Sequence, residues 1–400
     1  MLWYAPENVP DLRKQHVIVT STDGIALATT TPLAAKGAHV VLAGSNALEA
    51  SRAMQDVEAK VPGAQVEFMP CNFHSFKSIK EFADSYKRRG EPLHVLINHA
   101  QPLHGQVGTT EDGFEVTLGT HYFGLMYLTL LLLDVLHASG RSRIIFRSSP
   151  MEEYAHDVDW QDLRGKYASS ASDPQTCYHA ALYAIMLARE LQYQVDGSGI
   201  DVFATHPGTA DPELTSQLSW LDMRKWRLAF FQTAFGQTDK RGALSTLYCA
   251  TEPSMEGKGF GYYGPCYNPL MVLSLFKTGR RRPYNPHAVN EAECRRLFDD
   301  SLRIVNKAAE KATGQRVNLD HIKSKTARRR LFEDPGLGLE LTGCNFDRCT
   351  LLGVDQQMAY EYRTLDRILE RDDVQKWLAY AVKQRTVPKQ HAKSQLRYRR

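Results

Sequence analysis

The stretch QHVIVTSTDGIALATTTPLAAKGAHVVLA (15–43) indicates how this chain folds. It begins with a short β-rich run at 15–20, and a turn at 21–24 leads into a helical stretch that ends at Lys36. Gly37 stops the helix, and a second β-rich run follows at 38–43. A strand, a helix and a second strand in this order predict a βαβ unit with parallel strands.

The same alternation continues along the next two hundred residues. Further β-rich runs lie at 66–70, 92–97, 143–146 and 200–205, and helices are expected over 47–60, 75–89, 112–138, 178–195 and 240–251. Continuous apolar runs are typical of strands that are buried on both faces. With right-handed crossovers, the sequence predicts an α/β fold with a doubly wound parallel sheet of the Rossmann type.

Composition places the chain among ordered globular proteins. Of its 400 residues, 43% are hydrophobic and 24% are charged. Only Cys344 and Cys349 of the seven cysteines are close in sequence, so we expect reduced thiols and no metal site. The N-terminus lacks an apolar signal region, and the longest apolar stretch, 125–136, is shorter than a span of about 20 residues. We expect an intracellular, cytoplasmic protein without a membrane span; nuclear or membrane-surface association is the alternative.

Six stretches, in chain order, resemble motifs of the short-chain dehydrogenase/reductase family, in its retinol-dehydrogenase and WW-domain-oxidoreductase branch. They are KGAHVVLAGSN (36–46), EPLHVLINHA (91–100), DGFEVTLGTHYFGLMYL (112–128), RIIFRSS (143–149), VDWQDL (158–163) and HPGTADPEL (206–214). The resemblance covers about residues 14–310. We therefore expect an N-terminal arm (1–14), a Rossmann domain of this family (15–312) and a basic, mainly helical extension (313–400).

The resemblance implies NADP or NAD as the cofactor, but the glycine-rich loop departs from the family pattern. The family's three glycines match Thr20, Gly24 and Ala26, so only the middle glycine is kept. Glycines let the pyrophosphate approach the backbone closely, and Asp23 adds a carboxylate that repels phosphate. A capped turn that starts a helix is the alternative role of this loop. At the end of the second strand, Ser45 is neither the acid that selects NAD nor the arginine that selects NADP.

At the other cofactor positions, some replacements are mild and others are unfavourable for cofactor binding. The remaining positions that the resemblance assigns to the cofactor are Asn72, Asn98, Ala100, Pro207 and Gly208. Asn72 replaces the adenine-contacting aspartate, and its amide oxygen can still accept a hydrogen bond. Gln101 introduces a side chain where the cofactor ribose would approach, and Pro212 replaces the capping threonine. These changes argue against cofactor binding.

Two members of the family's catalytic tetrad are kept and two are replaced. In the family the serine holds the substrate oxygen, the tyrosine transfers the proton, the lysine lowers the tyrosine pKa and the asparagine supports a relay water. Ser149 and Tyr178 match the first two, whereas Leu182 takes the lysine position and His121 the asparagine position. A phenol with a pKa of about 10 needs a nearby cation to act at neutral pH, and leucine supplies none.

Three residues are candidates for a substitute cation, and the sequence leaves the choice among them open. Arg147 precedes the serines and should share a strand face with Ser149, since strand residues alternate between faces. His121 and His179 are the other candidates. Without such a substitute, Tyr178 would be an ordinary interior tyrosine and Ser149 a serine at a strand end.

The last hundred residues differ from the rest in charge. Residues 301–400 contain 21 Lys and Arg against 12 Asp and Glu, a net charge of +9, whereas residues 1–300 carry −5. Such a tail can bind a protein partner, nucleic acid or anionic lipid, or dock on the acidic part of its own chain. We favour a solvated or self-docking tail over nucleic-acid binding, because no aromatic platform accompanies the basic residues.

Two functions follow from these observations. The first is a pseudoenzyme of the family, in which dinucleotide binding and hydride transfer are lost or impaired and which acts by binding or scaffolding. The alternative is an active NADP-dependent oxidoreductase with an altered tetrad, acting on a lipophilic carbonyl or alcohol of retinoid or steroid type. A third, weaker alternative is a sensor that binds the nucleotide without turnover.

Overall fold

The computed structural model describes residues 4–22, 24–99, 108–165, 175–208, 238–266 and 277–319. They belong to one compact unit formed by Met1–Cys266 and Phe276–Asp334. A second unit, Tyr267–Leu275 and Pro335–Arg400, lies outside the described residues, and with it most of the basic extension.

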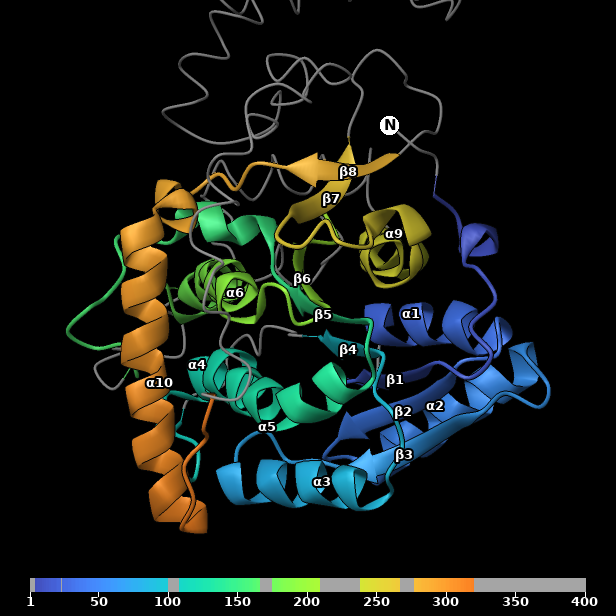
Figure 1. Cartoon of the computed structure of the whole chain (residues 1–400), viewed down its shortest axis with the longest axis horizontal. Helices are drawn as coiled ribbons and strands as arrows, with labels where there is room; N and C mark the ends of the chain where they lie inside the picture. The colour runs from blue at the N-terminus through green and yellow to red at the C-terminus, as the bar shows by residue number, and fades with distance from the viewer. Residues whose placement is uncertain are drawn as a thin grey trace, which may run out of the picture. The chain divides into compact units, whose positions relative to one another are not determined.

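The centre of the described unit is an eight-stranded sheet with the order β3-β2-β1-β4-β5-β6-β7-β8 (Figure 1). Its strands are β1 (His16–Val19), β2 (His39–Gly44), β3 (Val66–Pro70), β4 (Val95–Asn98), β5 (Ser142–Arg147), β6 (Ile200–Thr205), β7 (Tyr262–Cys266) and β8 (Lys277–Arg281). The first seven strands are parallel, which confirms the Rossmann-type fold. β8 is antiparallel to β7, because the ten residues 267–276 are too few for a crossover between parallel strands.

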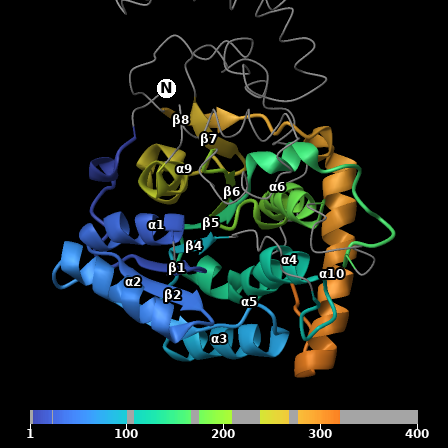
Figure 2. The same cartoon turned by 180° about the vertical axis from the view of Figure 1, so that it is seen from behind.

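Helices cover both faces of this sheet (Figures 1 and 2). They are α1 (Gly24–Ala35), α2 (Ala47–Lys60), α3 (Phe76–Arg88), α4 (Val116–Leu118), α5 (Leu125–Ala138), α6 (Gln175–Val195), α9 (Asp239–Thr251) and α10 (Glu291–Thr313). α1, α2 and α9 pack on one face, and α3, α5 and α6 pack on the other. α10 lies against α3 and α6 and adds an outer layer to the second face.

Two apolar cores result from this arrangement, one on each face of the sheet. In β1, Ile18 points to the core under α3, α5 and α6, while Val17 and Val19 point to the core under α1 and α9. Each of the three side chains is at most 1% exposed. Successive strand residues point to opposite faces of the sheet, and helices cover both faces. Residues on both faces of the strand are therefore buried, which explains why the strands are continuous apolar runs.

One long helical segment runs from Val116 to Ala138 and contains a π-helical turn at Gly119–Gly124. With 23 residues, it is by length and composition alone long and apolar enough to cross a membrane. The helix is therefore longer than the apolar stretch 125–136 expected from the sequence, and the absence of a membrane span stays a prediction. Most of the segment is buried inside the protein, packed between α3 and the sheet, as for the core helix of a soluble domain.

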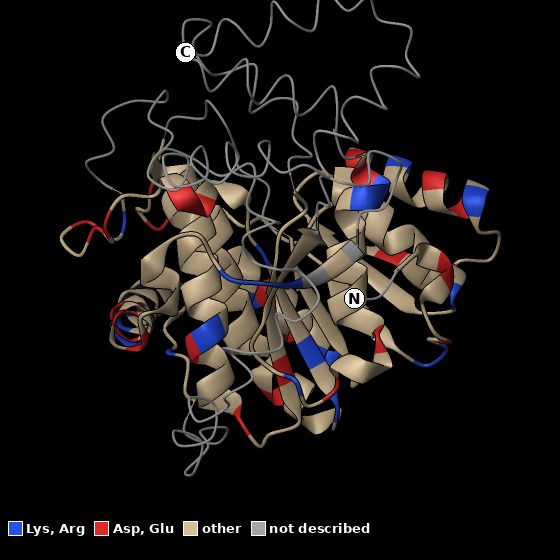
Figure 3. Cartoon of the chain, turned by 90° about the horizontal axis from the view of Figure 1, so that it is seen from above, with Lys and Arg blue, Asp and Glu red and all other residues tan. Residues whose placement is uncertain are grey.

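Charged residues of both signs are interspersed over the helices and loops in the view from above (Figure 3). In this view the acidic excess predicted for residues 1–300 is not gathered on any one element.

Candidate cofactor and catalytic site

The candidate site lies at the edge of the sheet where the parallel strands β1, β4 and β5 end. In doubly wound folds, ligands bind outside the carboxyl ends of the strands. Thr20 follows β1 and is buried, and its Oγ1 accepts a hydrogen bond from the backbone N–H of His99 at 2.8 Å. The first residue of the altered glycine motif therefore joins the ends of two strands, a role that a glycine could not fill.

His99 follows β4 and contacts the arginine that ends β5. Its Nε2 lies 2.8 Å from Nη1 of Arg147. The pKa of His99 is well below its usual value, chiefly because the ring is completely buried and secondly because Arg147 and His121 lie near it. A neutral ring that accepts from Arg147 at Nε2 carries its proton on Nδ1. Nδ1 is buried and has no hydrogen-bond partner among the described residues.

Asn98, the last residue of β4, presents a second unused polar atom at this edge. Its Nδ2 donates to Oγ1 of Thr129 on α5 at 2.9 Å, which fixes the amide orientation. Its Oδ1 is buried and accepts no hydrogen bond from the part of the chain that the structure describes. Asn98 and His99 are neighbours at the end of β4, where successive side chains point to opposite faces, so each unused atom by itself could be satisfied by a polar ligand or by water.

The two kept tetrad residues belong to different elements. Ser149 caps the short helix Pro150–Tyr154, and its hydroxyl accepts from the backbone N–H of Met151 at 3.3 Å. The neighbouring Ser148 donates to the carbonyl of Ala181 at 2.8 Å and so ties the end of β5 to α6. Tyr178 lies near the start of α6, 7% exposed, with its ring centroid 5.6 Å from that of Tyr154.

The replaced tetrad positions differ in burial. Leu182 lies one turn after Tyr178 on α6, is fully buried and belongs to the apolar core. His121 is in the π-helical turn, where the extra residue widens the helix next to the site. His179 stacks on Tyr183, with ring centroids 5.4 Å apart. That His121, His179 or Arg147 replaces the missing lysine stays a prediction.

The phosphate-binding end of the site is altered most. α1 begins at Gly24, which has a φ of +44°. A Cβ atom on Gly24 would lie 3.9 Å from Oδ1 of Asp239, a residue in the first turn of α9. A helix N-terminus attracts anions, and here a carboxylate of the protein itself lies beside it. Asp23, the carboxylate expected from the sequence, lies outside the described residues.

The remaining predicted cofactor residues serve local structure. Ser45 is exposed directly after β2. Asn72 accepts from the backbone N–H of His74 at 3.0 Å, within the turn before α3. Pro207 and Gly208 follow β6, and the N–H of Gly208 donates to Nδ1 of His206 at 3.2 Å. Three further predicted positions lie outside the described residues: Ala100, Gln101 and Pro212.

The two ends of the site therefore differ in their fit to a dinucleotide. The strand ends offer unused polar atoms, whereas the phosphate end offers a carboxylate and a single glycine of the motif. This phosphate end departs from the pattern by which the family binds a pyrophosphate, so we derive no step of a reaction through the cofactor. Sequence reasoning missed the contact of His99 with Arg147 and the position of Asp239. The one signal in the sequence is that these residues lie at the ends of predicted strands, where the site was expected, or at the start of a predicted helix.

Comparisons with known proteins agree with the fold. Residues 14–159 match the family model of short chain dehydrogenases. Retinol dehydrogenase 11 of Mus musculus is 31% identical over 295 residues, which are 73% of this chain and 86% of that protein. The WW domain-containing oxidoreductase of Danio rerio is 32% identical over 289 residues, 68% of this chain and 69% of that protein.

A solved structure of an uncharacterised protein from Mycobacterium paratuberculosis has a TM-score of 0.57 and 22% identity, and covers 79% of this chain and 100% of that one. This likeness shows the fold alone. Together with the parallel sheet and the six motifs in chain order, the relatives show that this chain belongs to the short-chain dehydrogenase/reductase family, in its retinol-dehydrogenase-like branch.

Proposed function

We propose that this chain is a pseudoenzyme of its family, in which dinucleotide binding and hydride transfer are lost or impaired and which acts by binding other molecules. The observation that carries the proposal is the full burial of Leu182 in the apolar core at the lysine position. An apolar side chain there neither lowers the pKa of Tyr178 nor holds a ribose hydroxyl.

Asp239 supports the same proposal from the other end of the site. Its carboxylate lies beside the N-terminus of α1, where the family binds pyrophosphate. Bringing a phosphate to this position would place like charges close together, at a site where Gly24 and Asp239 are both exposed to solvent. Loss of the lysine and obstruction of the phosphate would impair different steps, so restoring one would not restore turnover.

The alternative is an NADP-dependent oxidoreductase acting on a lipophilic carbonyl or alcohol. It is favoured by the buried, unused Oδ1 of Asn98 and Nδ1 of His99, which suit a polar ligand at the strand ends. Arg147 would then supply the cation next to this ligand. The names of the relatives, among them retinol dehydrogenase 11, suggest a retinoid as the first substrate to test.

A thermal-unfolding titration of the full chain with NADPH, NADP, NADH and NAD separates the two functions. We expect no shift of the unfolding midpoint at millimolar cofactor and no oxidation of NADPH with all-trans-retinal. A ligand at a hundredfold excess over its Kd would raise the midpoint by a few degrees. Such a shift together with NADPH consumption would overturn the proposal. A shift of the unfolding midpoint without consumption of NADPH would instead support a sensor that binds the nucleotide without turnover.

The binding role we assign to the basic extension, 313–400, where the positive charge is concentrated. A chain ending at Leu319 keeps α10, its cap Gly314 and the buried Leu319, and it should lose binding to an acidic partner. If the shortened chain bound such a partner equally well, the extension would not be the binding segment.

A further inference from the structure

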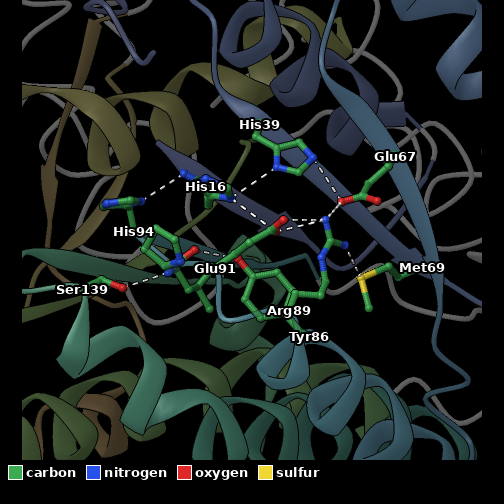
Figure 4. A network of polar contacts seen from close by, with 11 residues as sticks. His16, His39, Glu67, Met69, Tyr86, Arg89, Glu91, His94 and Ser139 are labelled. Atoms are coloured by element: carbon green, nitrogen blue, oxygen red, sulfur yellow. Dashed lines mark hydrogen bonds and ion pairs between the residues drawn. The ribbon is translucent and has the colours of Figure 1, made fainter. Parts of the chain in front are cut away.

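A cluster of histidine and glutamate side chains lies at the edge of the sheet opposite the candidate site (Figure 4). His16 is the first residue of β1, and His39 is the first residue of β2. The parallel register pairs these two residues directly, so their rings lie side by side. Glu91 comes from the loop before β4 and completes the group.

The spacing of these side chains matches the ligand set of a tetrahedral metal ion. Nδ1 of His16 lies 3.2 Å from Nδ1 of His39 and 3.6 Å from Oε2 of Glu91. One ligand atom from each residue can be chosen so that all three lie within 4.8 Å of one another. Zinc bound at about 2.0–2.1 Å holds two imidazole nitrogens roughly 3.3 Å apart in tetrahedral geometry. The pair of rings is therefore already at the separation that zinc requires.

A further carboxylate orients one of the rings. Nε2 of His39 lies 3.1 Å from Oε1 of Glu67 on β3, the strand next to β2. With a proton held on Nε2 by this contact, the lone pair of His39 is on Nδ1, the atom that faces His16. Histidine ligands of metals commonly donate their other N–H to a carboxylate in this way.

The charges around the group favour a cation. Arg89 pairs with both Glu67 and Glu91, so these three side chains together carry one negative charge. Oε2 of Glu91 is buried and accepts no hydrogen bond in the described part of the chain, but it lies 3.0 Å from Nη2 of Arg89, so a bound ion would share this oxygen with Arg89.

The group is open to solvent on one side and differs from its neighbour His94. The side chains of His16, His39 and Glu91 are 19%, 21% and 30% exposed, so an ion can reach them. His94 lies in the same network, but its Nδ1 accepts from the backbone N–H of His16 at 3.0 Å. It is therefore outside the ligand set and provides a matched control.

We propose that His16, His39 and Glu91 form a binding site for a divalent transition-metal ion, zinc fitting best, with Glu67 orienting His39. Two imidazoles and one carboxylate leave the fourth position to water or another ligand. The ion would join the starts of β1 and β2 to the loop before β4. It would bind to the folded chain and stabilise it, independently of any cofactor at the opposite edge.

The test is a thermal-unfolding titration of the full, metal-free chain with ZnCl₂. We expect zinc to raise the midpoint by several degrees at an excess over Kd. His16→Gln and His39→Gln should each weaken zinc binding by about a hundredfold, and Glu67→Gln by about tenfold. His94→Gln should bind zinc like the unaltered chain. Equal binding by all variants, or loss in His94→Gln to the same degree as in His16→Gln, would overturn the site.

A cobalt titration of the unaltered chain keeps the proposal testable if the histidine variants fail to fold. Cobalt(II) at this site should give the visible absorption of a tetrahedral ion with nitrogen and oxygen ligands, and Glu91→Gln should weaken it. A strong near-ultraviolet charge-transfer band from thiolate would place the ion on cysteines instead and contradict the assignment. An octahedral spectrum, unchanged in Glu91→Gln, would do the same.

Discussion

Arg147 and His99, the residues at the ends of β5 and β4, are joined by a hydrogen bond of 2.8 Å between Nη1 and Nε2. Complete burial lowers the pKa of His99, and the positive charge of Arg147 beside the ring lowers it further, which favours the neutral imidazole. The charge of Arg147 thus contributes to where protons are held at the strand ends.

Arg147→Gln should raise the pKa of His99, since it removes the nearer positive charge, although burial should still keep the pKa below 6.5. His121→Gln should raise it by less, because His121 lowers the pKa less than Arg147 does. The measurement is the imidazole titration followed by NMR, assigned with His99→Gln. A larger rise in His121→Gln than in Arg147→Gln would contradict the arrangement of charges.

Leu182→Lys should destabilise the protein by about 3 kcal/mol or more, because an ammonium group would be buried in an apolar core without a partner. Leu182→Met keeps the volume and should cost less than about 1.5 kcal/mol. Urea unfolding of both variants measures their free energies of unfolding for this comparison. Equal stabilities would mean that residue 182 reaches a polar cavity, and NADPH oxidation would then have to be measured again.

Asp239→Asn should improve binding of NADPH by about tenfold, since it removes a carboxylate from the N-terminus of α1 and leaves the side-chain shape unchanged. Asp56→Asn, an equal charge change on the exposed face of α2, is the control and should have no effect. Fluorescence titration with NADPH measures both. No gain in Asp239→Asn would show that the shortened glycine motif, rather than charge, prevents binding.

Gly199→Ala should destabilise the protein by about 3 kcal/mol, more than Gly197→Ala, for which about 1 kcal/mol is expected. Both glycines have a positive φ, +84° and +77°. A Cβ on Gly199 would also meet the carbonyl oxygen of Gly140 at 2.1 Å, whereas nothing lies within 4 Å of one on Gly197. The difference in the free energy of unfolding between the two variants, measured by chemical unfolding, gives the steric cost at Gly199. Similar losses of stability in both variants would disprove the close approach of Gly199 to Gly140.

Acid should destabilise the protein through His206. Complete burial, and secondly Arg281, lower the pKa of His206 from 6.5 to about 3. The unfolded chain therefore binds a proton that the folded chain does not, and the contribution of His206 is complete above pH 6.5 and lost as the pH falls toward 3. The loss is at most about 1.4 kcal/mol per pH unit. Unfolding by urea between pH 7.5 and 5 should show a shallower slope for His206→Asn; identical slopes would exclude this histidine as the cause.

The sequence was sufficient to predict the first six strands and most helices, because their residues are apolar on both faces or at helical spacing. β7 and β8 were not predicted, since Gly264 and Pro265 interrupt the first and the second, KTGRR, is mostly polar. Neither has the apolar run by which a buried strand is recognised. α10 was also not predicted as an element, although it is amphipathic.

For the site, family resemblance assigned Ser149, Tyr178 and Leu182 to tetrad positions, which stays a prediction, but it could not indicate which residues surround them. The contact of Arg147 with His99 joins residues 48 positions apart, and Asp239 approaches Gly24 from a helix near the other end of the domain. The histidines at 16 and 39 become neighbours only through the register of β1 and β2. Such contacts depend on the tertiary fold, which single-sequence spacing does not contain.

β3 and β8 are the first and last strands of the sheet, and each has one side unpaired within the described residues. Unpaired backbone groups on an edge strand can add a strand from another molecule and so start aggregation. β3 carries Glu67 and ends at Pro70, which has no N–H to donate, and β8 contains Arg280 and Arg281. The two strands that complete the sheet therefore also discourage the protein from associating edge to edge with copies of itself.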